Sequence, residues 1–222
     1  MTIVRFQNRT EAGRLLAKKL QAFANRSDVV VLALPRGGVP VGFEVATVLH
    51  APLDVFLVRK LGVPGQEELA MGAIASGGVQ VLNRPIVEAL DITPSQIESV
   101  AAAERQVLQR REQLYRAGRT SPVIAGRIVI LVDDGIATGS TMRAAIAALK
   151  KQQPARLVVA VPVAPPSTVS ELQAEGTQVV CIQAVEPFGA IGAWYEDFRQ
   201  VSDEQVIELL ATVAEGQSAL PA

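Results

Sequence analysis

Short apolar runs alternate with helical patterns along this chain. The apolar runs, rich in Val, Ile and Leu, occupy residues 29–34, 53–58, 128–132, 157–161 and 179–182. Runs of this length predict strands that are buried on both faces of a sheet. The patterns between them predict helices over residues 11–23, 41–49, 141–150 and 167–174. Alternating strands and helices are typical of an α/β fold, here a doubly wound and mainly parallel sheet.

One stretch interrupts this alternation. About seventy residues separate Val58 from Ile128, which is too many for a plain loop. The elements expected within it are a polar loop at 62–68, a hairpin of 69–75 with 79–82, and a helix from a capping box at 93–96 to about 117. We therefore predict a single domain, residues 1–222, with an inserted α/β lobe at 62–122 that covers the carboxyl edge of the sheet as a lid.

The helix predicted in this insertion has an apolar side and charged sides. Its apolar residues are Ile97, Val100, Val107, Leu108 and Leu114. Its charged residues include Glu104, Arg105, Arg110, Arg111 and Glu112. We interpret the charges as a solvated face, with a binding patch as the alternative.

Composition narrows the classes of function. The 222 residues are 49% apolar and 19% charged, which is typical of a folded domain. Lys and Arg number 21 against 22 Asp and Glu, so the net charge of −1 argues against a nucleic-acid or membrane-surface binder. The longest apolar runs fall far short of the roughly 20 residues that cross a bilayer, and we expect a cytoplasmic protein.

The most informative segment runs from Ile130 to Thr141. A predicted buried strand ends at Asp133 and Asp134, and a loop of small residues then leads into a helix. Ligands bind at this carboxyl edge of open parallel sheets. Free N–H groups at the helix start suit a phosphate, and the two carboxylates can accept hydrogen bonds from a vicinal diol. The segment therefore predicts a sugar-phosphate site. The alternative is that Asp133 and Asp134 only cap a turn. Capping is a poor reason for both, because two neighbouring ionised carboxylates repel each other.

This stretch, Val132-Asp133-Asp134-Gly135-Ile136-Ala137-Thr138-Gly139-Ser140-Thr141, resembles the phosphoribosyl pyrophosphate (PRPP) motif of type I phosphoribosyltransferases. Two further segments are similar to that family in the right order. Pro35-Arg36-Gly37-Gly38 resembles its pyrophosphate loop, and Val58-Arg59-Lys60 resembles the segment that opens the flexible catalytic loop of adenine and orotate phosphoribosyltransferases. The resemblance covers residues 28–163 in order.

The resemblance implies a Rossmann-like type I phosphoribosyltransferase fold and an enzyme of the glycosyltransferase class. It would transfer the phosphoribosyl group from PRPP to a nitrogen nucleophile such as a nucleobase, with Mg²⁺, and release pyrophosphate. The alternative is a non-catalytic protein on the same fold that senses PRPP or a nucleotide. Retention of Arg36, Arg59 and Lys60 favours the enzyme, because a sensor does not need cations for a leaving group.

The resemblance also implies roles for individual residues. Asp133 and Asp134 would hold the ribose hydroxyls and reach Mg²⁺ indirectly, through those hydroxyls or water. The 5-phosphate would be held by Ala137, Thr138, Gly139, Ser140 and Thr141. The pyrophosphate would be held by Pro35, Arg36, Gly37 and Gly38, with Arg59 and Lys60 as catalytic cations. A cis peptide is implied between Pro35 and Arg36, with the bond between Leu34 and Pro35 as the competing site.

The acceptor site is the least defined part of the prediction. Ala137 stands where hypoxanthine-guanine enzymes have an aspartate, which argues against a six-oxopurine acceptor of the usual kind. Residues 186–200 are a candidate hood, where Trp194 and Tyr195 could stack on a base and Asp197 could accept from its ring N–H. A packed corner is the alternative. We expect small-molecule substrates, neither nucleic acid nor membrane as partners, and a homodimer.

Overall fold

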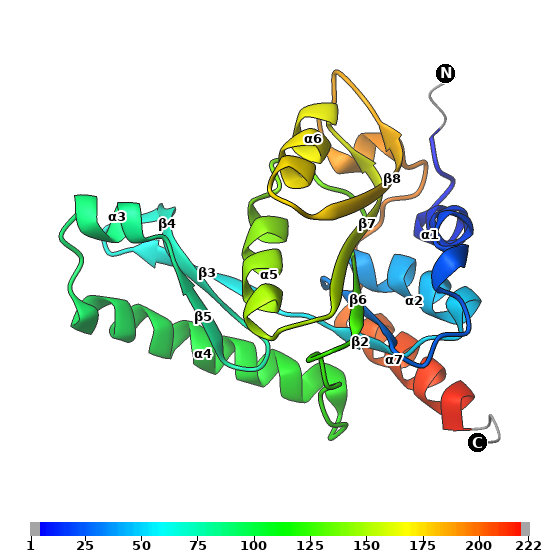
Figure 1. Cartoon of the computed structure of the whole chain (residues 1–222), viewed down its shortest axis with the longest axis horizontal. Coiled ribbons are helices and arrows are strands. Elements are labelled where there is room, and N and C mark those ends of the chain that lie inside the picture. Colours follow the sequence, from blue (N-terminus) through cyan, green and yellow to red (C-terminus); the bar gives the residue numbers. More distant parts are fainter. Residues whose placement is uncertain (1–4, 219–222) are drawn as a thin grey trace.

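The computed structural model describes residues 5–218 and confirms the α/β fold (Figure 1). Its central sheet has the strand order β2-β1-β6-β7-β8, and each neighbouring pair is parallel. The five strands are β1 (Val29–Ala33), β2 (Leu53–Val55), β6 (Ile128–Val132), β7 (Arg156–Ala164) and β8 (Gln178–Ala184). Strands β1 and β6 are buried along their whole length, as their continuous apolar runs predicted.

Helices cover both faces of the central sheet (Figure 1). One face packs against α1 (Arg9–Lys19), α2 (Gly38–Leu49) and α7 (Asp203–Ser218), and the other packs against α5 (Ser140–Lys151) and α6 (Pro166–Ala174). Two short 3₁₀ helices, η1 (Gln21–Phe23) and η2 (Ile191–Trp194), complete the fold around the sheet. Among residues 5–218, no helix is both long and apolar enough to cross a membrane.

The insertion has a sheet of its own, beside the central one (Figure 1). Its antiparallel strands are β3 (Val58–Val63), β4 (Gln66–Ala75) and β5 (Val79–Leu82), followed by α3 (Arg84–Ala89) and α4 (Pro94–Arg116). The hairpin of β4 with β5 confirms the predicted pairing. The predicted long helix is confirmed as well, since α4 begins with a complete capping box at Thr93.

Two expectations about the start of the insertion are wrong. The run at 53–58 is not one strand, because β2 ends at Val55 and β3 begins at Val58 in the other sheet. The polar stretch at 62–68 is mostly strand, since β3 and β4 form a hairpin. Gly62 misled the prediction: a Cβ there would lie 2.7 Å from the carbonyl oxygen of Glu67, so the glycine permits close strand contact rather than a loop.

Helix α4 joins the inserted lobe to the central sheet. The guanidinium Nε of Arg116 lies 2.9 Å from Oδ2 of Asp54 in β2, and both side chains are nearly buried. The predicted apolar side of α4 is partly wrong, because Leu114 is 46% exposed. The buried stripe runs instead through Ala101, Leu108 and Tyr115.

Candidate active site

The two aspartates of the motif lie at the carboxyl end of β6. Oδ1 of Asp133 accepts a hydrogen bond from the backbone N–H of Asp134 at 2.8 Å. Burial raises the pKa of both carboxyls, and the charge of Asp134 raises that of Asp133 further. The pair is therefore held in a fixed and poorly solvated position.

Arg9 is the counter-ion of Asp134, and sequence reasoning missed it. Its Nε lies 2.8 Å from Oδ2 of Asp134, and its Nη1 donates to the carbonyl oxygen of Arg199 at 2.8 Å. Its guanidinium also lies 3.9 Å from the ring centroid of Phe198. The positive charge of Arg9 opposes the effect of burial on the pKa of Asp134. No local signal could have found this pair, because 125 positions separate the two residues.

The loop after the aspartates leads into the N-terminus of α5. Gly139 has φ +76° and precedes the first turn of α5, where backbone N–H groups lack helical partners. The hydroxyls of Thr138 and Ser140 lie 3.2 Å apart at its exposed rim. Nη1 of Arg143 donates to the carbonyl oxygen of Thr138 at 3.0 Å and fixes the loop from the helix side. The expected phosphate-binding stretch thus occupies a helix N-terminus beside the carboxylates.

The loop at 35–38 packs directly on the aspartates. A Cβ added to Gly37 would lie 2.0 Å from Oδ2 of Asp134, and one on Gly38 would lie 2.9 Å from Cα of Asp133. Only glycine allows this approach at both positions. The peptide bond between Pro35 and Arg36 is cis, which confirms that expectation. The structure thus brings together two segments that the resemblance linked.

The expected pyrophosphate cations differ in where they lie. Arg59 lines a small cleft together with Pro35 and Thr141, and its Nε lies 2.6 Å from Oε2 of Glu104 on α4. Lys60 is exposed and does not line that cleft, because neighbouring side chains of a strand point to opposite faces. Both residues lie inside β3, not at the end of a central strand as predicted.

Nη1 of Arg36 lies 3.9 Å from Oδ1 of Asp203 at the start of α7. The same oxygen accepts a hydrogen bond from the hydroxyl of Tyr115 on α4 at 2.5 Å. The loop at 35–38, α7 and the inserted lobe therefore meet at one carboxylate.

Within the candidate hood, Tyr195 lies in a packed corner of the core. The ring of Tyr195 is buried against Phe6 and Phe198, and its hydroxyl donates to the carbonyl oxygen of Asp134 at 2.5 Å. Nε1 of Trp194 donates to the carbonyl oxygen of Phe188 at 3.0 Å. Tyr195 therefore supports the aspartate loop from the core and has no free face for a base.

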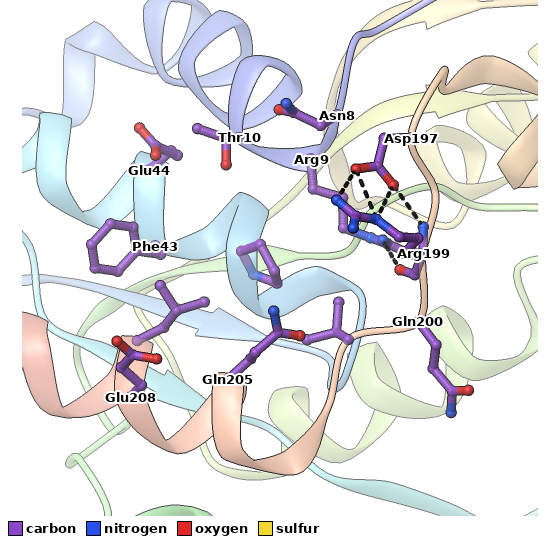
Figure 2. A pocket seen from close by; sticks show the side chains of 13 residues that line it. Asn8, Arg9, Thr10, Phe43, Glu44, Asp197, Arg199, Gln200, Gln205 and Glu208 are labelled. Atoms are coloured by element: carbon purple, nitrogen blue, oxygen red, sulfur yellow. Dashed lines mark hydrogen bonds and ion pairs between the residues drawn. The ribbon is translucent and has the colours of Figure 1, made fainter.

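A cavity of about 570 Å³ lies between α1, α2, α7 and the hood segment (Figure 2). Phe43 and Leu209 give it apolar surface, and Glu44, Asp197 and Glu208 give it acidic surface. Figure 2 shows Asp197 held by Arg199, with an Nη2–Oδ2 distance of 2.6 Å. Because Arg9 lines the cavity and also contacts Asp134, the cavity adjoins the aspartate pair.

Comparison with known proteins shows the family. The chain belongs to the phosphoribosyl transferase domain family, whose model matches residues 6–194. Two provisionally named phosphoribosyl transferases of Mycobacterium tuberculosis, from strains CDC 1551 and H37Rv, are each 44% identical to it over 205 residues, or 92% of the chain. The chain spans about half the length of these curated relatives, 46%.

Solved structures show the same fold. The crystal structure of TT1426 from Thermus thermophilus is 44% identical and has a TM-score of 0.85, covering 94% of this chain and 99% of that one. A hypothetical protein from Neisseria gonorrhoeae with bound ppGpp is 14% identical, with a TM-score of 0.50, covering 94% of this chain and 96% of that one. At that identity the likeness is one of fold alone.

Proposed function

We propose that the chain transfers the 5-phosphoribosyl group from PRPP to a nitrogen nucleophile, such as a nucleobase, and releases pyrophosphate. The observation that carries the proposal is the packing of Gly37 against Asp134. It sets an anion loop, a pair of diol-binding carboxylates and the N-terminus of α5 side by side. PRPP presents the matching groups in one molecule: a pyrophosphate, a ribose diol and a 5-phosphate.

In this proposal each segment holds one part of the donor. Asp133 and Asp134 accept hydrogen bonds from the ribose 2- and 3-hydroxyls. Residues 137–141 hold the 5-phosphate through backbone N–H groups and hydroxyls. Arg36 and Arg59 hold the pyrophosphate with guanidinium groups, whose planar fork suits phosphate oxygens. The chain contributes positioning and charge neutralisation while the C1–O bond breaks.

The residues present fit a Mg²⁺ that the donor itself largely holds. Among residues 5–218, no cluster of three or more His, Cys, Asp or Glu side chains could bind a metal ion by itself. Mg²⁺ commonly takes one or two carboxylates together with substrate phosphates and water. Asp133 and Asp134 would reach it through the ribose hydroxyls or water. Bound there, the ion supplies neutralisation of the pyrophosphate charge.

For the acceptor we propose the cavity of Figure 2, because Arg9 is shared between it and the ribose end. Its volume of about 570 Å³ suits a small heterocycle. Asp197 lines it and remains the proposed acceptor of a ring N–H. Ala137 supplies no carboxylate for a six-oxopurine.

One observation favours a second candidate, a non-catalytic protein that senses PRPP or a nucleotide. Arg59 is already paired with Glu104, and Arg36 faces Asp203. Cations held in this way stabilise the molecule without taking part in turnover.

The test is release of pyrophosphate from PRPP and Mg²⁺, measured across a panel of purines, pyrimidines and other nitrogen nucleophiles. The enzyme hypothesis predicts release that depends on one class of acceptor. PRPP binding without release for any acceptor would establish the sensor. Failure to bind PRPP at all would contradict both the transferase and the PRPP-sensor hypotheses.

A further inference from the structure

One side of helix α4 carries a row of residues at helical spacing that is not apolar throughout. Steps of four and three residues along its inward side lead through Ile97, Ala101, Glu104, Leu108, Arg111 and Tyr115. Ile97, Ala101, Leu108 and Tyr115 are buried. The other two positions carry charge. The Glu104 side chain is half-buried and therefore needs a partner, whereas Arg111 is exposed and carries no such penalty.

Glu104 is explained by its ion pair with Arg59. Arg111 is not explained in this way, because its guanidinium makes no hydrogen bond or ion pair with any residue in the 5–218 range. Its neighbour Arg110 is exposed as well, but Arg110 lies off the stripe and lines none of the cavities described above. The two arginines therefore share a helix and differ in direction.

Arg111 lies beside the proposed donor site. It lines the same small cleft as Arg59, Pro35 and Thr141, which come from the lobe, the loop at 35–38 and the start of α5. Burial and the hydrogen bond to Asp203 raise the pKa of Tyr115 to about 12, and the positive charges of Arg111 and Arg36 oppose that rise. Arg36 and Arg111 are thus both close enough to act on one hydroxyl.

We propose that Arg111 is a pyrophosphate-binding residue of the donor site, supplied by the inserted helix. The proposal rests on the proposed function. As the C1–O bond breaks, its electron pair leaves with the pyrophosphate oxygen, while the acceptor nitrogen donates a lone pair to C1 and loses its proton to water. The leaving group gains negative charge, and the unpaired guanidinium of Arg111 stabilises it with charge-assisted hydrogen bonds.

The experiment compares Arg111→Met, Arg111→Lys and the matched control Arg110→Met. Calorimetric titration with Mg²⁺–pyrophosphate and with ribose 5-phosphate needs no acceptor. We expect R111M to lose about tenfold or more in pyrophosphate affinity, R111K to recover part of it, and R110M to stay within about twofold. Affinity for ribose 5-phosphate should be unchanged in all three. Melting temperatures report whether each variant folds.

Equal pyrophosphate affinity in R111M and R110M would overturn the role of Arg111 while leaving the proposed function standing. Parallel losses for pyrophosphate and ribose 5-phosphate in a folded R111M would also overturn it, since they indicate a general distortion. A wild-type chain that binds neither PRPP nor pyrophosphate would instead refute the proposed function itself.

Discussion

The aspartate pair and the arginines of the inserted lobe differ in how much of each side chain is exposed and in what holds it in place. The side chain of Asp134 is only 10% exposed, and backbone packing through Gly37 and Gly38 fixes the pair. The side chain of Arg59 is 36% exposed and is held by a single ion pair with Glu104 on α4, whose carboxylate a bound anion could replace. In the proposed function, this difference corresponds to a preorganised ribose end and an adjustable pyrophosphate end. Substitutions in either region, or at the contact that joins them, test this difference.

The largest effect is expected from Asp133→Asn combined with Asp134→Asn. An amide oxygen is an uncharged and weaker acceptor than a carboxylate, so the hydrogen bonds to the ribose diol lose their charge assistance. PRPP affinity should fall by about a hundredfold or more, at roughly 1.5–3 kcal/mol for each charged hydrogen bond lost. The fold should survive, because the substitution relieves repulsion and the amide oxygen introduced at position 134 can still accept from Arg9. Calorimetry measures the affinity and circular dichroism the fold. Unchanged PRPP affinity in the folded variant would show that Asp133 and Asp134 do not bind the ribose.

The second prediction concerns the joint between the two regions. Arg116→Met leaves Asp54 buried without its partner, and we expect a loss of about 3–5 kcal/mol in the free energy of unfolding. Arg105→Met is the control, because its partner Glu98 is 64% exposed and such pairs contribute about 0–1 kcal/mol. Denaturant unfolding compares the two variants.

The decrease in the free energy of unfolding caused by Arg116→Met should depend on pH. Burial already raises the pKa of Asp54, and the charge of Arg116 opposes that rise, so removing Arg116 raises this pKa further. A carboxyl with a higher pKa in the folded than in the unfolded state favours folding as pH falls. The destabilisation should therefore be largest at neutral and alkaline pH and shrink on acidification. A decrease in the free energy of unfolding that grows on acidification would contradict the view that Arg116 stabilises the charged form of Asp54.

The smallest effect is expected from Glu104→Gln. Neutralising this carboxylate frees Arg59 for a ligand, and affinity for Mg²⁺–pyrophosphate should rise by about two- to fivefold, in keeping with a partly exposed ion pair. Glu98→Gln, on the same helix but paired with Arg105, should change nothing. Weaker pyrophosphate binding in E104Q would mean that Glu104 orients Arg59 and that the lobe is preorganised after all.

Local patterns predicted the central sheet, the hairpin of β4 with β5 and the start of α4, because burial period and capping are short-range signals. They did not find Arg9, whose partner lies across the whole fold. They also mistook Gly62 for a loop residue. For Gly62 the deciding contact lies across the hairpin, with Glu67 on the opposite strand. The interpretation of Arg111 as solvated agrees with its exposure, and only the cleft that it lines gives it a proposed role.

The central claim is that the aspartate pair binds the ribose end of the donor and the lobe binds the pyrophosphate end. Titrating ribose 5-phosphate and Mg²⁺–pyrophosphate separately into two variants tests it most directly. Asp133→Asn with Asp134→Asn should lose ribose 5-phosphate and keep most of its pyrophosphate affinity. Arg59→Met with Arg111→Met should show the reverse. Equal losses of both ligands in either folded variant would contradict the division of the site.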